Sequence, residues 1–337
     1  MKIIVPMAGM GKRMRPHTLT VPKPLIPIAG KPIVQRLVED IAQVCNEPVD
    51  EVAFIIGRAF GKEVESNLQK IAESVGAKAS IVYQDEALGT AHAILCAKES
   101  LTGPLVVAFA DTLFKADFKL DSSAAGTIWV QKVDDPKPFG VVKLDDSGEI
   151  TDFVEKPEEF VSDLAIIGIY YFQDGAYLRE ELQYLLDNDI KDKGEYQLTN
   201  ALENMKNKGT KFVPGRVTEW LDCGNKDATV FTNQRYLEYL QERGEKLVAD
   251  SAKITNSVLI EPVYIGENAV VTNSVVGPHV SLGDNSNVRD SVLTNSIVQK
   301  SASVLHANIT NSMVGNNATV VSAPADLSLG DFNTLRV

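Results

Sequence analysis

The chain has 337 residues, of which 44% are hydrophobic and 23% are charged, and its formal net charge is −12. Because this length exceeds what one hydrophobic core usually holds, two domains of unequal size are predicted. The excess of 45 Asp and Glu over 33 Lys and Arg repels polyanions. Bulk binding of nucleic acid is therefore disfavoured, and any anionic ligand must meet a local basic site.

The sequence lacks the usual signs of a membrane protein or a secreted protein. No run of about 18 apolar residues is present, and the start MKIIVPMAG is typical of a short strand that enters a loop. Cys45, Cys96 and Cys223 have no CxxC spacing, so neither a disulfide framework nor a zinc site is indicated, and inert thiols are expected. A cytoplasmic protein without membrane association is predicted.

The first 240 residues alternate short apolar runs with helical patterns. KIIVPM, EVAFIIG, ASIVYQ and PLVVAFAD are rich in β-branched residues, and helical stretches such as PIVQRLVEDIAQVC separate them. This alternation is typical of βαβ units around a largely parallel sheet with helices on both faces. In residues 126–157 the strands shorten and turn signals such as DDSG accumulate. An inserted antiparallel region is therefore predicted there, where a second substrate could bind.

A different pattern follows the predicted helix ATVFTNQRYLEYLQERGEK. Residues 252–321 lack a strong helical pattern, and single aliphatic residues recur there at steps of five or six. These residues are Ile254, Ile260, Ile265, Val271, Val276, Leu282 and Val288. The pattern is similar to the hexapeptide repeat of a left-handed parallel β-helix, in which three hexapeptides form a coil, the aliphatic side chains point inward, and roughly four coils would fit. The predicted domains are residues 1–240 and residues 241–337.

The segment MAGMGKRMRPHTLTVPKPLIPIAGKPI, residues 7–33, gathers glycines and basic residues in an acidic chain. Gly9 and Gly11 follow the first strand, where backbone N–H groups can approach an anion closely, and Arg13 and Lys23 add positive charge. The segment is neither a P-loop nor a dinucleotide fingerprint, because a proline follows the candidate Gly-Lys pair and the third glycine of the fingerprint is absent. From spacing alone, a tight turn with a solvated charged surface stays open as an alternative.

The longer pattern of this segment resembles the signature of the sugar-phosphate nucleotidyltransferases, GxGxRxxPxTxxxPKPLxPxxGKP. The matching residues are Gly9, Gly11, Arg13, Pro16, Thr18, Pro22, Lys23, Pro24, Leu25, Pro27, Gly30, Lys31 and Pro32. The resemblance continues in order at GTAHA (89–93), FAD (109–111), FGVV (139–142), VEKP (154–157), EYQLTN (195–200) and WLDCGN (220–225). It implies an α/β fold, with a Rossmann-like mixed-sheet nucleotidyltransferase domain followed here by the short left-handed β-helix. The closest pattern is that of the glucose-1-phosphate thymidylyltransferases that carry such a tail.

The resemblance implies an in-line attack of a sugar-1-phosphate oxygen on the α-phosphate of a nucleoside triphosphate, with release of pyrophosphate. This step depends on positioning and on neutralising phosphate charge. Backbone N–H groups around Ala8, Gly9 and Gly11 would hold the triphosphate, and Arg13 and Lys23 would act as the catalytic cations. A solvated loop lysine is the alternative for Lys23, but two prolines fix its place.

The family's metal-binding aspartates correspond to Asp111 and Asp222. Asp111 ends the apolar run LVVAFAD, and Asp222 lies in WLDCGN. Mg²⁺ takes oxygen ligands and needs only one or two carboxylates from the protein. A helix cap or a turn is the alternative role for an Asp at a strand end.

The resemblance also implies the two substrate-specific regions. Gln84, Gly89 and Thr90 would contact the nucleotide, with the glutamine and glycine reading the edge of a pyrimidine base. The sugar-1-phosphate would lie across a second set of residues, in which the glutamate accepts hydroxyl donors and the lysine pairs with the phosphate. That set is Gly140, Glu155, Lys156 and Trp220. A surface glutamine and an exposed ion pair are the alternative readings of Gln84 and of the Glu–Lys pair.

Departures from the family pattern make the choice of nucleotide open. Lys12 replaces a frequent Thr, Thr112 follows Asp111 where Asn or His is common, and Pro6 and Met7 begin the signature loop. The predicted nucleotide is dTTP, with UTP second because a glutamine alone does not sense the thymine methyl group. Glucose-1-phosphate is the predicted acceptor.

Two other functions stay open. Left-handed β-helices often carry acyl transfer with a histidine as base, and His279 and His306 are the only candidates in the tail. Related chains can also serve as nucleotide-sugar sensors without turnover, typically after losing metal or phosphate ligands. The more natural role for the tail is self-association or effector binding, so a homo-oligomer is expected.

Overall fold

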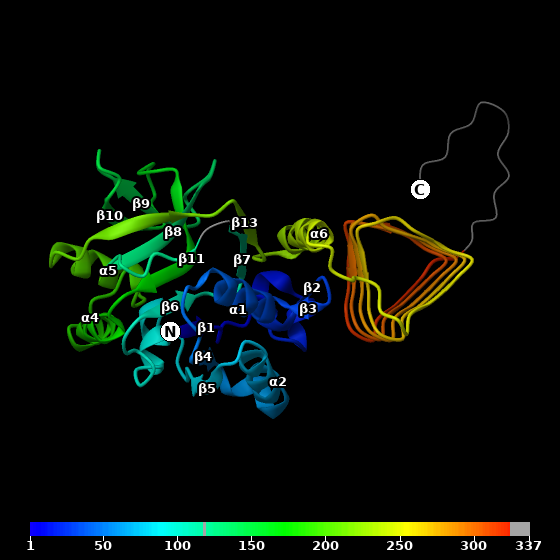
Figure 1. The fold of residues 1–337 in the computed structure, drawn as a ribbon, viewed down its shortest axis with the longest axis horizontal. Coiled ribbons are helices and arrows are strands. Elements are labelled where there is room, and N and C mark those ends of the chain that lie inside the picture. Colours follow the sequence, from blue (N-terminus) through cyan, green and yellow to red (C-terminus); the bar gives the residue numbers. More distant parts are fainter. Residues whose placement is uncertain (117–118, 324–337) are drawn as a thin grey trace. The chain divides into compact units, whose positions relative to one another are not determined.

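The computed structural model describes residues 1–116 and 119–323, and these form two compact units (Figure 1). Of the described residues, the first unit contains those in 1–26 and 31–229, and the second contains Pro27–Gly30 and residues 230–323. The division therefore falls within helix α6 (Lys226–Glu242), close to the predicted boundary at residue 240. The short segment Pro27–Gly30 is the one early part of the chain that belongs to the second unit.

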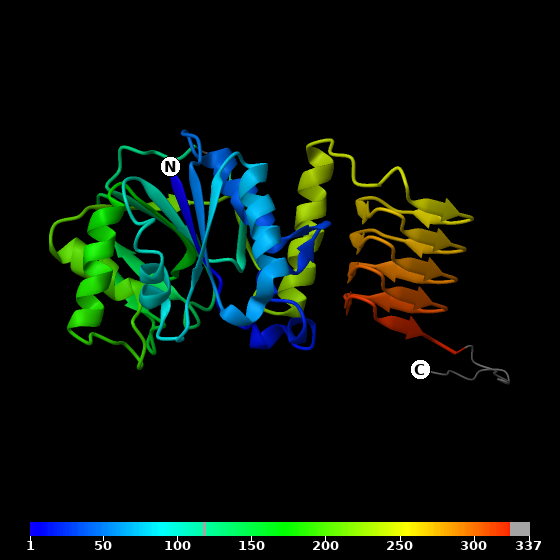
Figure 2. The same ribbon diagram turned by 90° about the horizontal axis from the view of Figure 1, so that it is seen from below.

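The first unit is built on a nine-stranded mixed sheet (Figures 1 and 2). Its main path runs β10-β9-β11-β6-β1-β4-β5, and β8 and β12 continue from β11. The strands are β1 (Lys2–Pro6), β4 (Glu51–Ile56), β5 (Lys78–Tyr83), β6 (Leu105–Ala108), β8 (Gly126–Lys132), β9 (Gly140–Leu144), β10 (Ile150–Glu155), β11 (Leu164–Phe172) and β12 (Phe212–Arg216). β1 pairs in parallel with β4 and β6, whereas β9 and β10 pair antiparallel. The predicted α/β fold class and the antiparallel region are confirmed.

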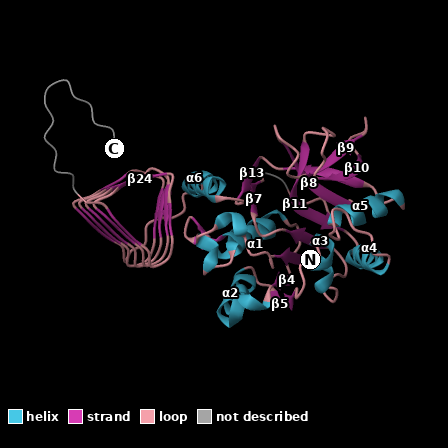
Figure 3. Cartoon of the chain, turned by 180° about the vertical axis from the view of Figure 1, so that it is seen from behind, coloured by secondary structure: helices cyan, strands magenta, loops and turns pink. Residues whose placement is uncertain are grey.

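Helices cover both faces of this sheet (Figure 3). They are α1 (Ile33–Val44), α2 (Gly61–Ser74), α3 (Thr90–Cys96), α4 (Gly175–Asp187) and α5 (Leu198–Asn207). One core cluster joins Ile4 and Val107 of the sheet with side chains of α3, α4 and α5. Because side chains alternate along a strand, Ile3 and Val5, which are also fully buried, face the other layer. Strands buried on both faces explain why β1 and β6 are continuous apolar runs.

Short elements lie in the loops of the first unit and in the turn Pro27–Gly30. They are η1 (Lys12–Met14), η2 (His17–Leu19), η3 (Lys23–Leu25), η4 (Arg58–Phe60), β2 (Pro27–Ile28), β3 (Lys31–Pro32), β7 (Thr112–Lys115) and β13 (Glu219–Asp222). β7 and β13 form an antiparallel two-stranded ribbon apart from the main sheet. No helix in the described part of the chain is long and apolar enough to cross a bilayer.

The second unit contains a run of parallel strands in three sheets, which is the arrangement of a left-handed parallel β-helix (Figures 1 and 2). The first sheet is β14 (Lys253–Thr255), β17 (Val270–Thr272), β20 (Asn287–Arg289), β23 (Ser303–Leu305) and β26 (Thr319–Val321). The second is β15 (Val258–Leu259), β18 (Val275–Val276), β21 (Val292–Thr294) and β24 (Asn308–Thr310). The third is β16 (Val263–Ile265), β19 (Val280–Leu282), β22 (Ser296–Val298) and β25 (Met313–Val314).

The coils are shorter than three full hexapeptides. Register partners lie 17 residues apart in the first coils, as in Lys253 with Val270, and 16 residues apart later, as in Asn287 with Ser303. This shortening explains the imperfect spacing of the aliphatic residues in the sequence. Each coil still places one strand in each of the three sheets, so the type of fold is unchanged.

Most of the predicted inward residues are buried. Ile265, Val271, Val276, Leu282 and Val288 are fully buried within one core cluster. The prediction is wrong for Ile254 and Ile260, which are 38% and 43% exposed. Both lie in the first coil, which has a neighbouring coil on only one side, so their inner faces are left partly open.

Candidate active site

The first unit contains a cavity of about 440 Å³ at the carboxyl ends of β1 and β6. This edge of a parallel sheet is where α/β proteins usually bind ligands. The lining includes nine of the predicted site residues, namely Ala8, Gly9, Gly11, Arg13, Lys23, Gln84, Gly89, Thr90 and Asp111. The structure therefore gathers the predicted nucleotide-binding residues, both predicted cations and one predicted metal ligand around one space.

The loop after β1 has the open backbone expected of an anion-binding loop. A Cβ atom at Gly9 would meet nothing within 4 Å, so a ligand can approach the backbone there. Gly11 has φ +60°, and a Cβ atom at that position would come within 2.7 Å of the Lys23 Cβ. The loop is held by its own hydrogen bonds, because the carbonyl oxygen of Gly11 accepts from the Thr18 hydroxyl at 2.8 Å and from the Met14 N–H at 2.9 Å.

Lys23 is a buried cation paired with a partly exposed carboxylate. It begins η3, and its Nζ lies 2.8 Å from Oδ2 of Asp111. The lysine side chain is 9% exposed, whereas that of Asp111 is 43% exposed. A buried charge needs a partner, and Asp111 supplies it while leaving the other side of the ion pair open to the cavity.

The ribbon of β7 and β13 brings the two predicted metal ligands together. Asp222 pairs in register with Thr112, and the Cys223 N–H donates to the backbone oxygen of Asp111 at 3.0 Å. Burial raises the pKa of Asp222, and the negative charge of Asp111 raises it further, while the Gly224 N–H, Lys23 and Arg13 lower it. Burial is thus the larger cause of the raised pKa, and the repulsion by Asp111 adds to it.

Gly224 is a site residue that the sequence analysis did not single out. It lines the cavity, and a Cβ atom there would come within 2.7 Å of Oδ2 of Asp222. A larger residue at this position would therefore push the Asp222 carboxylate out of its place. The signal was available, because Gly224 stands two residues after Asp222 in WLDCGN.

The two carboxylates of Asp111 and Asp222 offer the oxygen ligands that a magnesium ion prefers. Among the described residues, no group of three or more His, Cys, Asp or Glu side chains could hold a metal ion. Mg²⁺ does not need such a cage, because it usually takes one or two carboxylates and completes its shell with water and phosphate oxygens. Relief of the repulsion between Asp111 and Asp222 would favour a divalent cation at this place.

Gln84, Gly89 and Thr90 lie together on one side of the cavity. The side-chain nitrogen of Gln84 is 3.1 Å from Nδ1 of His92 and 3.5 Å from the carbonyl oxygen of Gly89. Gly89 has φ +118°, and a Cβ atom there would overlap the carbonyl oxygen of Tyr196. This glycine is therefore required for the close approach of two backbone segments.

Thr90 has a structural task besides lining the cavity. Its hydroxyl donates to Oε1 of Gln197 at 3.1 Å and accepts from the Leu198 N–H at 2.9 Å, which ties α3 to the start of α5. His92 and the buried Gln197 were not singled out in the sequence, although both lie inside the matched motifs GTAHA and EYQLTN.

The predicted sugar-phosphate residues form a second group outside the lining of this cavity. Gly140 pairs with Glu155 across β9 and β10, and Nζ of Lys156 lies 3.3 Å from Oε1 of Glu155. Trp220 joins the group through Phe139, the residue before Gly140, whose ring it meets edge to face at 4.9 Å. The indole N–H of Trp220 is buried and has no hydrogen-bond partner in the part of the chain that the structure describes.

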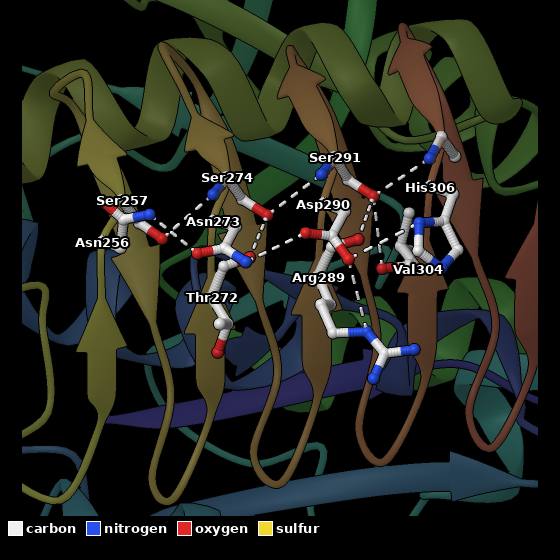
Figure 4. Close-up of polar contacts among 11 residues, drawn as sticks. Asn256, Ser257, Thr272, Asn273, Ser274, Arg289, Asp290, Ser291, Val304 and His306 are labelled. Carbon is white, nitrogen blue, oxygen red and sulfur yellow. Dashed lines mark hydrogen bonds and ion pairs between the residues drawn. The ribbon is translucent and has the colours of Figure 1, made fainter. Parts of the chain in front are cut away.

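The two β-helix histidines are engaged in separate structural contacts. Nε2 of His279 lies 2.9 Å from Oε1 of Glu238 in α6. His306 occupies one corner of the β-helix, where Asn256, Asn273 and Asp290 stand one coil apart (Figure 4). The side chains of Asn256, Asn273 and Asp290 form a hydrogen-bonded ladder, and Nδ1 of His306 lies 3.5 Å from Asp290.

This corner repeats because its backbone repeats. The four stacked residues have φ between +47° and +55°, a conformation that asparagine and aspartate tolerate well. A second row runs beside them, in which the Ser257, Ser274 and Ser291 hydroxyls accept from the N–H of the next coil at 3.0–3.1 Å (Figure 4). His306 therefore continues a structural ladder of the coil corners.

Comparison with known proteins places the chain in a family. The family model described as nucleotidyl transferase matches residues 2–239. The low-salt glycan biosynthesis nucleotidyltransferase Agl11 of Haloferax volcanii is 30% identical over 268 residues, which are 77% of this chain and 72% of the relative. The glucose-1-phosphate thymidylyltransferase of Streptomyces antibioticus is 30% identical over 79% of this chain and 78% of its own length.

Other relatives are longer, and the fold recurs in solved structures. The bifunctional protein GlmU of Methanococcus vannielii is 30% identical over 77% of this chain, but the match spans only 61% of that relative. A putative glucose-1-phosphate thymidylyltransferase from Bacillus anthracis has a similar fold, with a TM-score of 0.58 and 24% identity over 69% of this chain and 93% of that chain. The match of residues 2–239 establishes that this chain belongs to the nucleotidyl transferase family, as the resemblance of its opening segment to the sugar-phosphate nucleotidyltransferases predicts.

Proposed function

We propose that this chain transfers a nucleotidyl group from a nucleoside triphosphate to a sugar-1-phosphate, giving a nucleoside-diphosphate sugar and pyrophosphate. The observation that carries the proposal is the cavity in which the open Gly9–Gly11 loop, Arg13 and the buried Lys23–Asp111 pair face one space. Glucose-1-phosphate is the first candidate acceptor. The candidate nucleotides are dTTP first and UTP second.

In this proposal the protein positions two phosphates and neutralises their charge. An oxygen of the sugar phosphate attacks the α-phosphorus, the new P–O bond forms on one side, and the bond to the β-phosphate breaks on the other. The attacking oxygen is already ionised, so no general base is needed. Backbone N–H groups of the loop at Ala8, Gly9 and Gly11 hold the triphosphate. Arg13 and Lys23 stabilise the negative charge that moves onto the leaving pyrophosphate.

Asp111 and Asp222 are the proposed holders of Mg²⁺. When bound, the ion would neutralise phosphate charge that the protein cations do not reach. Lys23 keeps its contact with Asp111 and still has two further N–H donors for phosphate oxygens, because an ammonium group carries three. The Asp111 carboxylate would thus fix Lys23 at the reacting end of the cavity.

The base and the sugar would be recognised by the two groups of residues described above. Gln84 and Gly89 would contact the base edge from one side of the cavity. Glu155 would accept sugar hydroxyls, Lys156 would pair with the sugar phosphate, and the indole N–H of Trp220 would find an acceptor on the substrate. Gly140 leaves room beside Glu155, since a Cβ atom there would lie 3.1 Å from its Oε2.

Two observations favour an active enzyme over the alternatives. A sensor without turnover typically lacks metal or phosphate ligands, whereas Arg13, Lys23, Asp111 and Asp222 are all present here. Acyl transfer by the β-helix receives no support from the site, since His279 and His306 have the structural contacts described above. The homo-oligomer stays a prediction, and light scattering of the purified protein tests it.

The test is pyrophosphate release with Mg²⁺ in a grid of dTTP, UTP, GTP, CTP and ATP against glucose-1-phosphate, mannose-1-phosphate and N-acetylglucosamine-1-phosphate. Turnover with dTTP and glucose-1-phosphate supports the proposal in full. Turnover with another pair keeps the reaction and replaces the named substrates. A folded protein that is silent across the grid, yet is stabilised against heat by nucleotides, would favour the sensor.

A further inference from the structure

The turn Pro27–Gly30 lies inside the family signature, residues 7–33, but belongs to the second unit of the molecule. It follows Lys23 by four residues, and the chain returns to the first unit at Lys31. Two side chains of the second unit hold this turn. They are Asn233 of α6 and Tyr264 of β16.

Asn233 joins the turn to the β-helix through one oxygen atom. Its side chain is fully buried, and its Oδ1 accepts from the Ala29 N–H at 2.9 Å and from the Ser281 hydroxyl at 2.7 Å. A backbone N–H can only donate, so the acceptor facing Ala29 must be the amide oxygen. The Nδ2 atom of Asn233 has no hydrogen-bond partner among the residues that the structure describes. The task of this side chain therefore rests on its oxygen.

Tyr264 closes the other side of the turn. Gly30 has φ +86°, and a Cβ atom on it would overlap the ring of Tyr264, at 2.1 Å from Cζ. Ala29 has φ +47°, a conformation that alanine rarely adopts. An unfavourable backbone of this kind persists only where the surroundings determine it, and here Asn233 and Tyr264 supply those surroundings.

We infer that Asn233 and Tyr264 are positioning residues for nucleotidyl transfer, because they hold the turn that fixes the end of the lysine-bearing helix η3. The link runs along a short stiff peptide. Pro24 and Pro27 each fix one φ angle, and the Leu25 and Ile26 N–H groups donate to the carbonyl oxygens of Pro22 and Lys23 at 2.9 and 3.1 Å. A displaced turn therefore displaces the backbone of Lys23. This inference rests on the proposed function, since it assigns Lys23 a task in the reaction.

The experiment compares four variants of the full chain by hydrogen–deuterium exchange, by steady-state kinetics and by thermal unfolding. Asn233→Leu keeps the side-chain volume and removes both hydrogen bonds, whereas Asn233→Asp keeps an acceptor oxygen. Ser281→Ala removes one bond only and serves if the leucine variant fails to fold. Ser286→Ala is the matched control, because this serine is also buried in the β-helix and its hydroxyl has no partner within the described residues.

For Asn233→Leu we expect the Ala29 amide to exchange about tenfold faster, and the Leu25 and Ile26 amides to exchange faster with it. We expect kcat to fall about tenfold while both KM values change less than twofold, because a misplaced lysine weakens the transition state more than the ground state. Asn233→Asp restores most of kcat, Ser281→Ala shows a smaller loss, and Ser286→Ala matches the wild type.

Two results would overturn the inference. An unchanged exchange rate at Ala29 would mean that Asn233 does not hold the turn. Faster exchange at Ala29 alone, with the Leu25 and Ile26 amides and kcat unaltered, would mean that the turn is held but does not position Lys23. If the wild type shows no turnover with any substrate pair, the proposed function fails on its own, and exchange at Leu25 and Ile26 still decides the link.

Discussion

The candidate-site cavity and the β-helix fix their side chains in opposite ways. Around the cavity each contact occurs once, as where Gly89 meets the backbone of Tyr196 or Gly224 meets the carboxylate of Asp222. In the β-helix the same contact recurs coil after coil, as in the ladder that Asn256 and Asn273 begin. A contact that occurs once shapes one place in the molecule, whereas a contact that recurs adds to stability in every coil. Substitutions in the cavity should therefore alter turnover, and substitutions in the β-helix should alter unfolding, except at the contacts that hold the turn Pro27–Gly30.

The largest effect is expected for Asp222→Asn. We expect kcat to fall by on the order of a thousandfold or more, because a proposed metal ligand and its charge are lost. The pKa of Asp222 is raised in the folded protein. At a pH above the ordinary pKa of an aspartate, the ionised carboxylate therefore lowers the stability of the folded protein relative to the unfolded chain. The neutral amide removes this penalty. Thermal unfolding at pH 7 should therefore give a Tm equal to or above that of the wild type.

Asp111→Asn removes a proposed metal ligand that is also the counter-ion of Lys23. Turnover should fall as far as in Asp222→Asn, but Lys23 then keeps its buried charge without a carboxylate partner, so the Tm should fall. Asp146→Asn in the exposed DDSG turn is the control and should leave both quantities unchanged. Equal Tm values for the Asp111 and Asp222 variants would contradict the assignment of Asp111 as the counter-ion of Lys23.

Lys23→Met should lower kcat by about a hundredfold or more, as expected when a charge that stabilises the transition state is removed. The matched control is Lys31→Met, since Lys31 lies in the same signature segment but pairs with Glu39 at 2.9 Å outside the cavity. Pyrophosphate release measures both variants. A similar loss in the two variants would mean that net charge of the segment, rather than the place of Lys23, supports the reaction.

Val288→Ala tests the β-helix side of the comparison. Val288 is fully buried, so we expect the free energy of unfolding of the second unit to fall by about 2 kcal/mol, with kcat unchanged. Val292→Ala is the control. Val292 lies in β21 and is 41% exposed, so its truncation should change the free energy of unfolding very little. Denaturant unfolding measures both. Equal losses would contradict the inward and outward alternation of the coils.

The smallest effect concerns a thiol that takes no part in the site. Burial raises the pKa of Cys45 to about 11, so the thiol stays neutral at pH 8 and becomes a thiolate only in strongly alkaline solution. Iodoacetamide at pH 8 should leave Cys45 unmodified in the folded protein, and mass spectrometry detects the label. Cys96 is the comparison, since it is the only half-buried thiol of the three and should react first. Rapid labelling of Cys45 would contradict its burial.

The sequence predicted most of the cavity because the signature ties chemistry to fixed spacing. Nine predicted residues line one space, and the βαβ alternation placed their strands correctly. Gly224 was within reach of sequence reasoning, because it stands two residues after Asp222 in the same motif. Gln197 was missed because its partner Thr90 lies 107 residues upstream. Spacing within a motif does not carry such information.

The β-helix shows the opposite limit of sequence reasoning. Its type follows from periodicity, which is a local property. The exposure of Ile254 and Ile260 depends instead on the missing neighbour of the first coil, and the attachment of Ala29 to Asn233 depends on tertiary contact. Neither leaves a local pattern. The sequence therefore predicted the fold type of the tail. The contacts of the second unit with the turn Pro27–Gly30 became visible only in the structure.

The place of Pro27–Gly30 has a consequence for how such a gene can evolve. The backbone passes between the two units three times, and Ala29 lies 204 positions upstream of the side chain that binds it. If the C-terminal unit were joined to the first unit at one point of the chain only, a single recombination event could replace it as a whole. Here a recombinant that acquires a foreign tail would inherit a turn fitted to the old one. Descent should therefore keep the signature turn and its tail together as a matched pair, changing by small compensating steps.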